Sequence, residues 1–164
     1  MTAFQIRPAI AADAAPIAQI ESEAAAELGH ASGDSARRLV FWKEAIEFGE
    51  PLLQVAVSGD TVVGFAGYDR SRDPRTPPTT GEIWALHVRQ THFGQGAGLA
   101  LWDAVREALI DEGCTQVSIW IELASERALR FHELAGFKRD MSSLRTVARG
   151  ARRVEEIRLK RALS

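Results

Sequence analysis

The alternation of apolar and polar positions predicts short strands and amphipathic helices along the whole chain. Residues 4–7 alternate like a strand, and a helix with Ile17 and Ile20 on one face follows Asp13, a residue type that caps helices. The same pattern continues to the C-terminus. It predicts helices over 35–48, 99–112 and 125–135, and strands over 52–57, 61–68, 82–88, 116–123, 141–148 and 154–163.

The order of these elements predicts an α/β (α+β) fold with a mixed, mostly antiparallel sheet of six to seven strands and about four helices. A helix between the strands 82–88 and 116–123 implies a parallel crossover, whereas the turns at Gly59 and Gly150 imply antiparallel hairpins. The segment 70–81 is rich in proline and predicts a long loop between two strands, not a linker. We therefore expect a single domain over residues 1–164.

The composition narrows the class of protein. A chain of 164 residues with 46% hydrophobic and 26% charged residues is typical of a soluble globular domain. The single cysteine, Cys114, excludes an internal disulfide framework. We see no membrane span, no signal peptide and no His, Asp or Glu cluster with metal-ligand spacing, so we expect a cytoplasmic protein without a metal. Basic residues that are mostly arginine hint at a bacterial source.

The charge is uneven along the chain. The formal net charge is −2, but residues 138–164 carry nine basic and three acidic side chains. A solvated terminal hairpin would explain this, and so would an anionic ligand or a nucleic acid. The negative overall charge argues against nucleic acid.

A glycine-rich segment carries the most specific chemistry. A predicted strand ends at Val88, and Gly94, Gly96 and Gly98 precede a predicted helix. This geometry directs free backbone N–H groups and the positive end of the helix toward one point, which suits a pyrophosphate. The segment lacks the lysine of a P-loop and the spacing of a dinucleotide fingerprint, and a purely structural turn is the alternative.

Two segments together resemble one family. FGQGAG at 93–98 is similar to the [Q/R]-x-x-G-x-[G/A] motif of the GNAT superfamily of acetyl-CoA-dependent N-acetyltransferases, and SERALRFHELAGF at 125–137 is similar to its second signature. The element order also fits that fold from end to end. Phe93, Ser125 and His132 depart from the usual Gln or Arg, Asn and Tyr.

The resemblance implies where acetyl-CoA binds. Pantetheine would lie in a splay between the fourth and fifth strands, and the glycine loop would hold the pyrophosphate. The Leu86 N–H would polarise the acetyl carbonyl. The cofactor-binding residues implied in this way are Leu86, Val88, Phe93, Gly94, Gln95, Gly96, Ala97, Gly98, Leu99 and Ser125.

The resemblance also implies catalytic roles. Glu82 lies eleven residues before Phe93, the offset of the catalytic glutamate in histone-acetylating members, so we expect it to act as general base. His132, at the place of the family tyrosine, would protonate the leaving thiolate. The alternatives are a solvated glutamate with a water chain as base, and a surface histidine with solvent as acid. Aromatic residues expected at the acceptor are Trp42, Trp84 and Trp120.

The function expected is transfer of the acetyl group from acetyl-CoA to a primary amine of a small molecule or protein, by direct attack in a ternary complex. The alternative is a non-catalytic protein that binds or senses acyl-CoA. Relatives often dimerise through their last strands, and the apolar end at Ala162 and Leu163 is compatible with a homodimer. We expect no nucleic-acid and no membrane partner.

Overall fold

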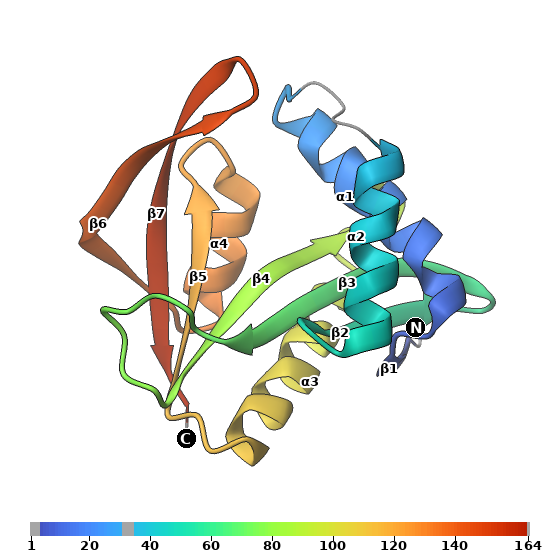
Figure 1. Cartoon of the computed structure of the whole chain (residues 1–164), viewed down its shortest axis with the longest axis horizontal. Coiled ribbons are helices and arrows are strands. Elements are labelled where there is room, and N and C mark those ends of the chain that lie inside the picture. The colour runs from blue at the N-terminus through green and yellow to red at the C-terminus, as the bar shows by residue number, and fades with distance from the viewer. Residues whose placement is uncertain (1–3, 31–34, 164) are drawn as a thin grey trace. The chain divides into compact units, whose positions relative to one another are not determined.

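The computed structural model describes residues 4–30 and 35–163 (Figure 1). Over these residues the chain forms seven strands, four α-helices and two 3-10 turns, η1 (Ala11–Asp13) and η2 (Gln90–His92). The helices are α1 (Ala14–Glu27), α2 (Ser35–Phe48), α3 (Ala97–Asp111) and α4 (Glu126–Leu134). The strands are β1 (Gln5–Pro8), β2 (Leu52–Ser58), β3 (Thr61–Arg70), β4 (Thr80–Val88), β5 (Gln116–Glu122), β6 (Lys138–Arg149) and β7 (Arg152–Ala162).

The strands form one mixed sheet in the order β1-β2-β3-β4-β5-β7-β6. β4 pairs with β5 in parallel through the crossover helix α3, while β1–β2, β2–β3, β5–β7 and β6–β7 are antiparallel. The predicted fold class and the parallel crossover are therefore confirmed. By its contacts the chain divides into two compact units, and the single domain stays a prediction.

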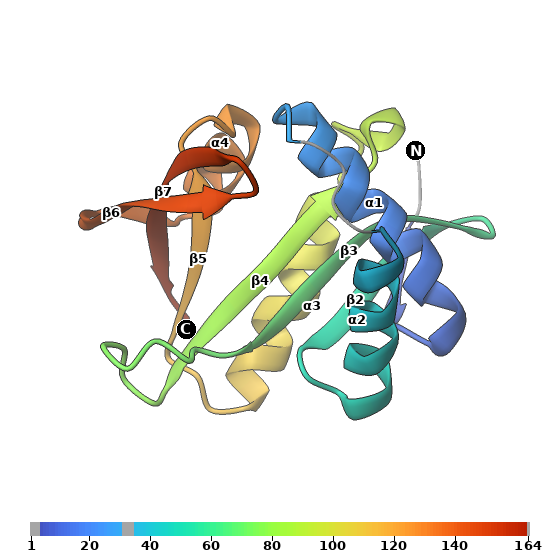
Figure 2. The same cartoon turned by 45° about the horizontal axis from the view of Figure 1, so that its top comes forward.

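Unit 1 comprises the described residues of Met1–Asp69 and Trp84–Ala108. Its core lies between the helices α1 and α2 and the strands β2 and β3, and Figure 2 shows these two helices side by side over the strands. Trp42 of α2 packs edge-on against Phe65 of β3 at 5.3 Å between ring centroids. Gly64 precedes Phe65 and therefore faces the opposite side of the sheet. A Cβ added there would touch Leu101 of α3. Both faces of this part of the sheet are thus covered.

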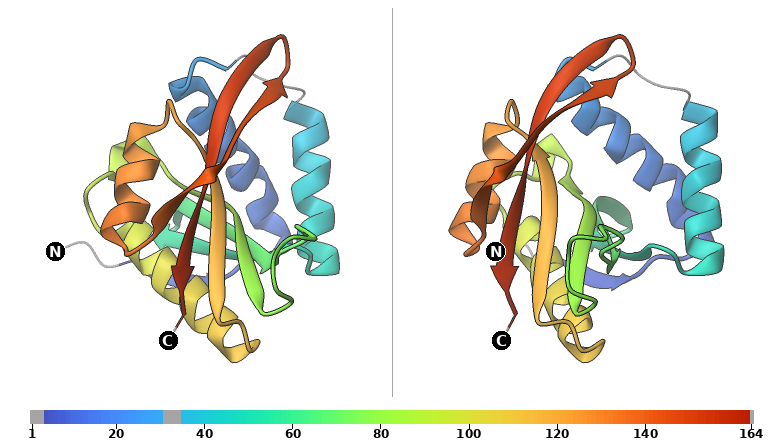
Figure 3. Two further views of the ribbon diagram at one scale, coloured as in Figure 1. Left: turned by 90° about the vertical axis from the view of Figure 1, so that its left-hand side faces the viewer. Right: turned by 60° about the vertical axis from the view of Figure 1, so that its left-hand side comes forward.

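Unit 2 comprises Arg70–Ile83 and Leu109–Ser164, and its sheet has one apolar and one polar face. In the apolar row Ile83 pairs with Ile119, which pairs with Leu159, and all three are buried. Gly81 lies in the adjacent row, where an added Cβ would come within 2.7 Å of Leu109 at the end of α3. α4 also belongs to this side, alongside β5 and β7 in Figure 3, since Gly136 beyond its end faces Arg161 of β7.

The polar face of unit 2 follows from the same alternation. Glu82 pairs with Ser118, and Ser118 with Lys160, so these three side chains share one face. The next row consists of Trp120 and Arg158, followed by Glu122 and Glu156. This face carries the polar network described below.

One predicted helix cap is wrong in its detail. Asp13 precedes α1 at the N-cap position, but its side chain makes no cap hydrogen bond. Its carboxylate instead accepts hydrogen bonds from Arg7 at 2.7 Å and from the backbone N–H of Ile10 at 2.8 Å. The Asp13 side chain therefore closes the η1 turn before the helix and binds Arg7.

Candidate active site

The glycine loop lies in unit 1, between the end of β4 and the start of α3. Gly94 has φ of 74° and Gly96 has φ of 93°, a region that glycine enters without strain. The Ala100 N–H donates to the Gly96 carbonyl at 3.0 Å, so the N–H groups of residues 97–99 precede the intrahelical hydrogen bonds. Within the described chain the first turn of α3 carries no acidic side chain. This geometry provides an anion-binding helix start.

The loop is fixed to the core of unit 1 by Arg89, which sequence reasoning did not single out. The Arg89 backbone N–H donates to the Val63 carbonyl at 2.8 Å, and its Nε donates to the Val62 carbonyl at 3.2 Å. Its guanidinium also forms an ion pair with Glu23 of α1. Because Arg89 directly follows β4, these contacts set where the glycine loop begins.

The residues predicted along the loop differ in exposure. Ala97 is buried, while Leu99 is exposed and Gly94, Gln95 and Gly96 lie at the surface. Phe93 and Gly98 are half-buried, as are Leu86, Val88 and Trp84 on β4. The predicted pyrophosphate loop follows directly after the predicted pantetheine strand in the sequence, and both Leu86 and the loop belong to unit 1.

Glu82 lies on the polar face of unit 2, half-buried. Burial raises the pKa of its carboxyl, and the negative charge of Asp73 raises it further. The hydroxyl of Ser71 donates to Glu82 Oε1 at 3.3 Å and opposes this shift. A carboxyl whose pKa is moved toward neutrality is better matched to taking up a proton than an ordinary surface glutamate.

His132 is buried, only 2% exposed, which rules out the surface histidine considered as an alternative. Its Nδ1 lies 2.8 Å from the Ala128 carbonyl and therefore donates to it, so in the neutral ring Nε2 carries no proton. Nε2 is buried and has no hydrogen-bond partner among the described residues. Burial lowers the pKa of His132, and the rings of Phe131 and Phe137 pack edge-on against it at 5.1 Å.

The predicted base and the predicted acid lie on opposite sides of the unit 2 sheet. Glu82 belongs to the polar face, whereas α4, which carries His132, packs on the side of Gly136 and Arg161. Ser125 occupies the N-cap position of α4, but its side chain makes no cap hydrogen bond.

The three tryptophans predicted at the acceptor have different surroundings. Trp42 is 2% exposed in the core of unit 1, with its Nε1–H donating to Glu21 at 3.1 Å, so it offers almost no surface to a ligand. Trp84 is half-buried on β4. Trp120 is half-buried on β5, and the Arg145 guanidinium stacks 3.6 Å from the centre of its ring.

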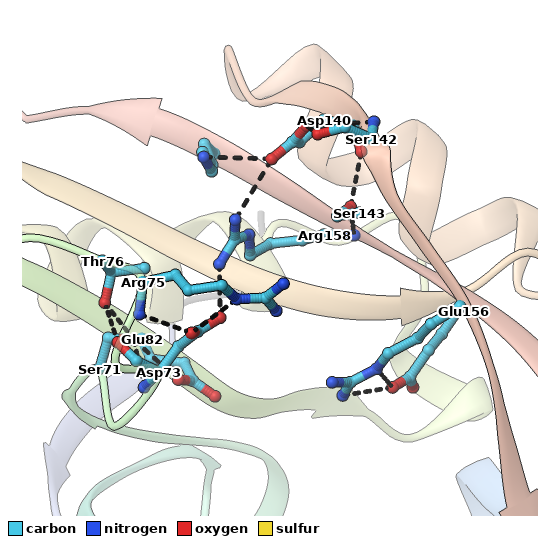
Figure 4. A network of polar contacts seen from close by, with 12 residues as sticks. Ser71, Asp73, Arg75, Thr76, Glu82, Asp140, Ser142, Ser143, Glu156 and Arg158 are labelled. Carbon is cyan, nitrogen blue, oxygen red and sulfur yellow. Dashed lines mark hydrogen bonds and ion pairs between the residues drawn. The ribbon is translucent and has the colours of Figure 1, made fainter.

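A polar network covers this face of unit 2 and was missed from the sequence (Figure 4). Arg158 of β7 donates to Asp73 of the loop at 2.7 Å and to Asp140 of β6 at 3.2 Å. Asp73 also accepts from the backbone N–H of Arg75 at 2.9 Å, which lowers its pKa. Ser71 connects this loop to Glu82. The hydrogen-bond partners in this network lie up to 85 residues apart, so no local sequence pattern predicts these contacts.

A cavity of about 450 Å³ opens beside this network. Its lining consists of Arg75, Trp120, Arg158 and residues 142–145. Three arginines line it, and no carboxylate does. Among the described residues no group of three or more His, Cys, Asp or Glu could hold a metal ion. No helix in the described ranges is long and apolar enough to span a membrane.

Known proteins resemble the chain in both sequence and fold. A family model described as the acetyltransferase (GNAT) family matches residues 17–137. A mouse protein, "Probable N-acetyltransferase family 8 member 5", is 32% identical over 85 residues, which cover 52% of this chain. The match spans only 37% of that relative.

Two solved structures illustrate the likeness in fold. An N-acetyltransferase from Staphylococcus aureus Mu50 superposes with a TM-score of 0.81 at 17% identity, covering 99% of this chain and 100% of the other. The structure of yncA from Salmonella typhimurium, solved with its cofactor acetyl-CoA, superposes with a TM-score of 0.76 at 23% identity, over 99% and 95% of the two chains.

Proposed function

Because the chain belongs to the acetyltransferase (GNAT) family, we propose that it transfers the acetyl group of acetyl-CoA to a primary amine by direct attack in a ternary complex. One observation carries this proposal: a strand, a glycine loop with two left-handed glycines, and a helix start follow one another in unit 1. This is the arrangement that a pyrophosphate requires.

The residues present fit acetyl-CoA. The surface position of Gly94 and Gly96 leaves the loop backbone accessible, since a Cβ built at either glycine meets nothing within 4 Å. The loop would hold the pyrophosphate through backbone N–H groups, so that Phe93 in place of the usual Gln or Arg removes a side chain but not these donors. When bound, acetyl-CoA supplies an acetyl group activated as a thioester.

Glu82 is the proposed general base. The acceptor amine must lose a proton to attack, and a lysine-like amine has a pKa of about 10.4 in water. The Glu82 carboxylate would take this proton directly or through a water, and its raised pKa favours keeping it. The Leu86 N–H would donate to the acetyl oxygen as negative charge grows there.

His132 is the proposed proton donor to the leaving thiolate, and its surroundings set a condition. Nε2 must carry the proton at that moment, although in the neutral ring the proton lies on Nδ1 toward Ala128. A negative sulfur beside the unpartnered Nε2 would favour its protonation. Solvent is the alternative proton source.

The test combines ligand binding with turnover. In a thermal-shift titration with acetyl-CoA, CoA and NADPH, we expect stabilisation by the two CoA species only, by about 2.7 kcal/mol at a hundred times Kd. We then expect release of CoA thiol in the presence of a primary amine. Stabilisation without thiol release for any amine would favour a non-catalytic acyl-CoA-binding protein. A lack of stabilisation by saturating CoA would contradict the assignment of the glycine loop.

A further inference from the structure

The cavity of unit 2 lies on the same sheet face as Glu82. Trp120 and Arg158, which line it, form the row of paired residues next to that of Glu82, Ser118 and Lys160. Glu82 is also linked to it by hydrogen bonds, through Ser71 and Asp73 to Arg158. At about 450 Å³ the cavity falls within the range of small-molecule sites, roughly 300 to 1,000 Å³. A molecule bound there would lie beside the proposed base.

The arginines of the cavity retain unused donors. Arg145 binds Glu156 Oε1 through Nε at 2.7 Å and Nη2 at 2.6 Å, and its Nη1 has no partner among the described residues. The Arg75 Nε donates to Asp73 at 3.4 Å, both Nη groups lack a partner in the described ranges, and the side chain is 75% exposed. These donors lie in the described chain on residues that line the cavity, so an anion could bind them without breaking an existing ion pair.

The position of Arg145 is fixed before any ligand arrives. Its guanidinium stacks on Trp120, and Glu156, 2% exposed, holds it through one carboxylate oxygen. The other oxygen of Glu156 accepts from Arg149 at 3.0 Å, so two arginines share one carboxylate. Arg149 also forms an ion pair with Glu122 at 3.7 Å, so the two arginines face two carboxylates. An anion in the cavity would therefore be bound through the unused donors of Arg145 and Arg75. A preorganised guanidinium beside an aromatic ring suits a planar carboxylate.

We propose that the acceptor is an amine that also carries a carboxylate, with this carboxylate held by Arg145 and Arg75 beside Trp120 and its amino group directed toward Glu82. The assignment rests on the proposed function and names the substrate class of that same site. A free amino acid or a similar small zwitterion fits this description. An amine without an acidic group would leave the donors of Arg145 and Arg75 without an anionic partner, and it would bind more weakly for that reason.

The experiment compares matched acceptors. CoA thiol release is measured for the twenty L-amino acids and for the carboxamide of each, which has the same side chain and amino group without the charge. We expect at least one acid to turn over with a kcat/KM about a hundred times that of its carboxamide. Titration calorimetry of the same acids on the CoA-bound protein gives a second readout that does not require turnover.

Two variants assign the effect to the cavity. Arg145→Gln should raise KM for the best acid by about tenfold or more, change kcat little, and leave the carboxamide unaffected. Arg153→Gln is the matched control, because Arg153 is an exposed arginine of the same hairpin that does not line the cavity. Acetyl-CoA binding and the melting temperature of both variants show whether the fold is intact.

The outcomes separate the two proposals. Equal or faster turnover of carboxamides, or an unchanged KM in Arg145→Gln, would overturn the acidic acceptor while leaving the acetyltransferase standing. If no amine turns over, binding decides: failure of every acid to bind the CoA-bound protein at 10 mM, a concentration chosen to detect binding of about −2.7 kcal/mol, also overturns it. Failure of acetyl-CoA itself to bind would contradict the proposed function instead.

Discussion

Glu82 and His132 have the residue types that proton transfer requires, but burial decides which protonation state each prefers. Burial raises the pKa of the Glu82 carboxyl and lowers the pKa of the His132 imidazole, so it disfavours the charged form of both groups. Glu82 can act as base only in its charged form. A neutral His132 must gain a proton at Nε2 to act as acid. The pH dependence of turnover therefore reports on both residues.

Glu82→Gln tests the base. Turnover should fall by about a hundredfold to ten-thousandfold, because the amide cannot accept a proton. In the parent protein kcat/KM should fall as the pH drops through the raised pKa of Glu82, and this acidic limb should disappear in the variant. Retention of the limb would assign it to another group. Glu44→Gln, on an exposed glutamate of α2, is the matched control and should leave the profile unchanged.

The same variant carries a prediction on stability. A carboxyl with a raised folded-state pKa stabilises the fold fully below its unfolded pKa, and this contribution is lost as the pH rises through the folded value. At pH 7 the buried charge of Glu82 is therefore a cost that glutamine does not carry. Glu82→Gln should melt no lower than the parent at pH 7, with a smaller gap at pH 4. A clearly lower melting temperature at pH 7 would contradict the burial argument.

His132→Phe tests the acid while keeping an aromatic ring between Phe131 and Phe137. The variant loses the Nδ1 bond to Ala128, a cost of roughly 1 kcal/mol in the free energy of unfolding, and it loses Nε2 entirely. We expect kcat to fall by about tenfold to a hundredfold with acetyl-CoA binding unchanged. Undiminished kcat would show that solvent protonates the thiolate.

At the scale of secondary structure, the join between β4 and α3 positions the predicted phosphate site. The strand ends at Val88, and Arg89 is hydrogen-bonded to β3 and ion-paired with α1. Two glycines with positive φ then lead the chain into the helix. The sequence GQG is recognisable because only glycine adopts a positive φ without strain. What it cannot reveal is the Arg89 anchor, since Val62 and Glu23 are distant in sequence.

Gly96→Ala tests this loop. Alanine at φ of 93° is strained by about 1–2 kcal/mol, and the loop would relax away from the geometry that binds pyrophosphate. We expect about tenfold weaker binding of acetyl-CoA, measured by calorimetry. Gly59→Ala at the β2–β3 turn, with φ of 60°, is the control: it carries comparable strain and should lower stability without changing affinity. Equal loss of affinity in both variants would mean that the effect is one of general stability.

At the scale of the whole molecule, the basic end proves to be largely paired. Arg139 bonds to Glu133, Arg145 and Arg149 share Glu156, and Arg158 and Lys160 both bond to Asp140. Some of the carboxylates come from outside the basic segment: Asp73 lies in the loop after β3, and Glu133 lies in α4. The charge count along the sequence therefore overstates the charge available to a partner.

This pairing predicts no appreciable affinity for DNA. In a gel-shift assay with a short duplex at 150 mM salt, we expect no binding tighter than the non-specific range, roughly 10⁻⁴ to 10⁻⁶ M. Lowering the salt to 50 mM should produce at most a weak complex. Tight binding with a steep salt dependence would instead support a nucleic-acid partner for the basic hairpin.

The sequence by itself determined the order of the helices and strands, the parallel crossover and the glycine loop, because each rests on local periodicity or on the backbone freedom of glycine. Ser35–Phe48 is helical over the range predicted, and β4 begins at Thr80, two residues before the prediction. Only the tertiary structure decided that Trp42 is a core residue, that His132 is buried, and that Arg158 reaches Asp73. These properties depend on contacts between residues far apart in the chain, which no local pattern of apolar and polar positions specifies.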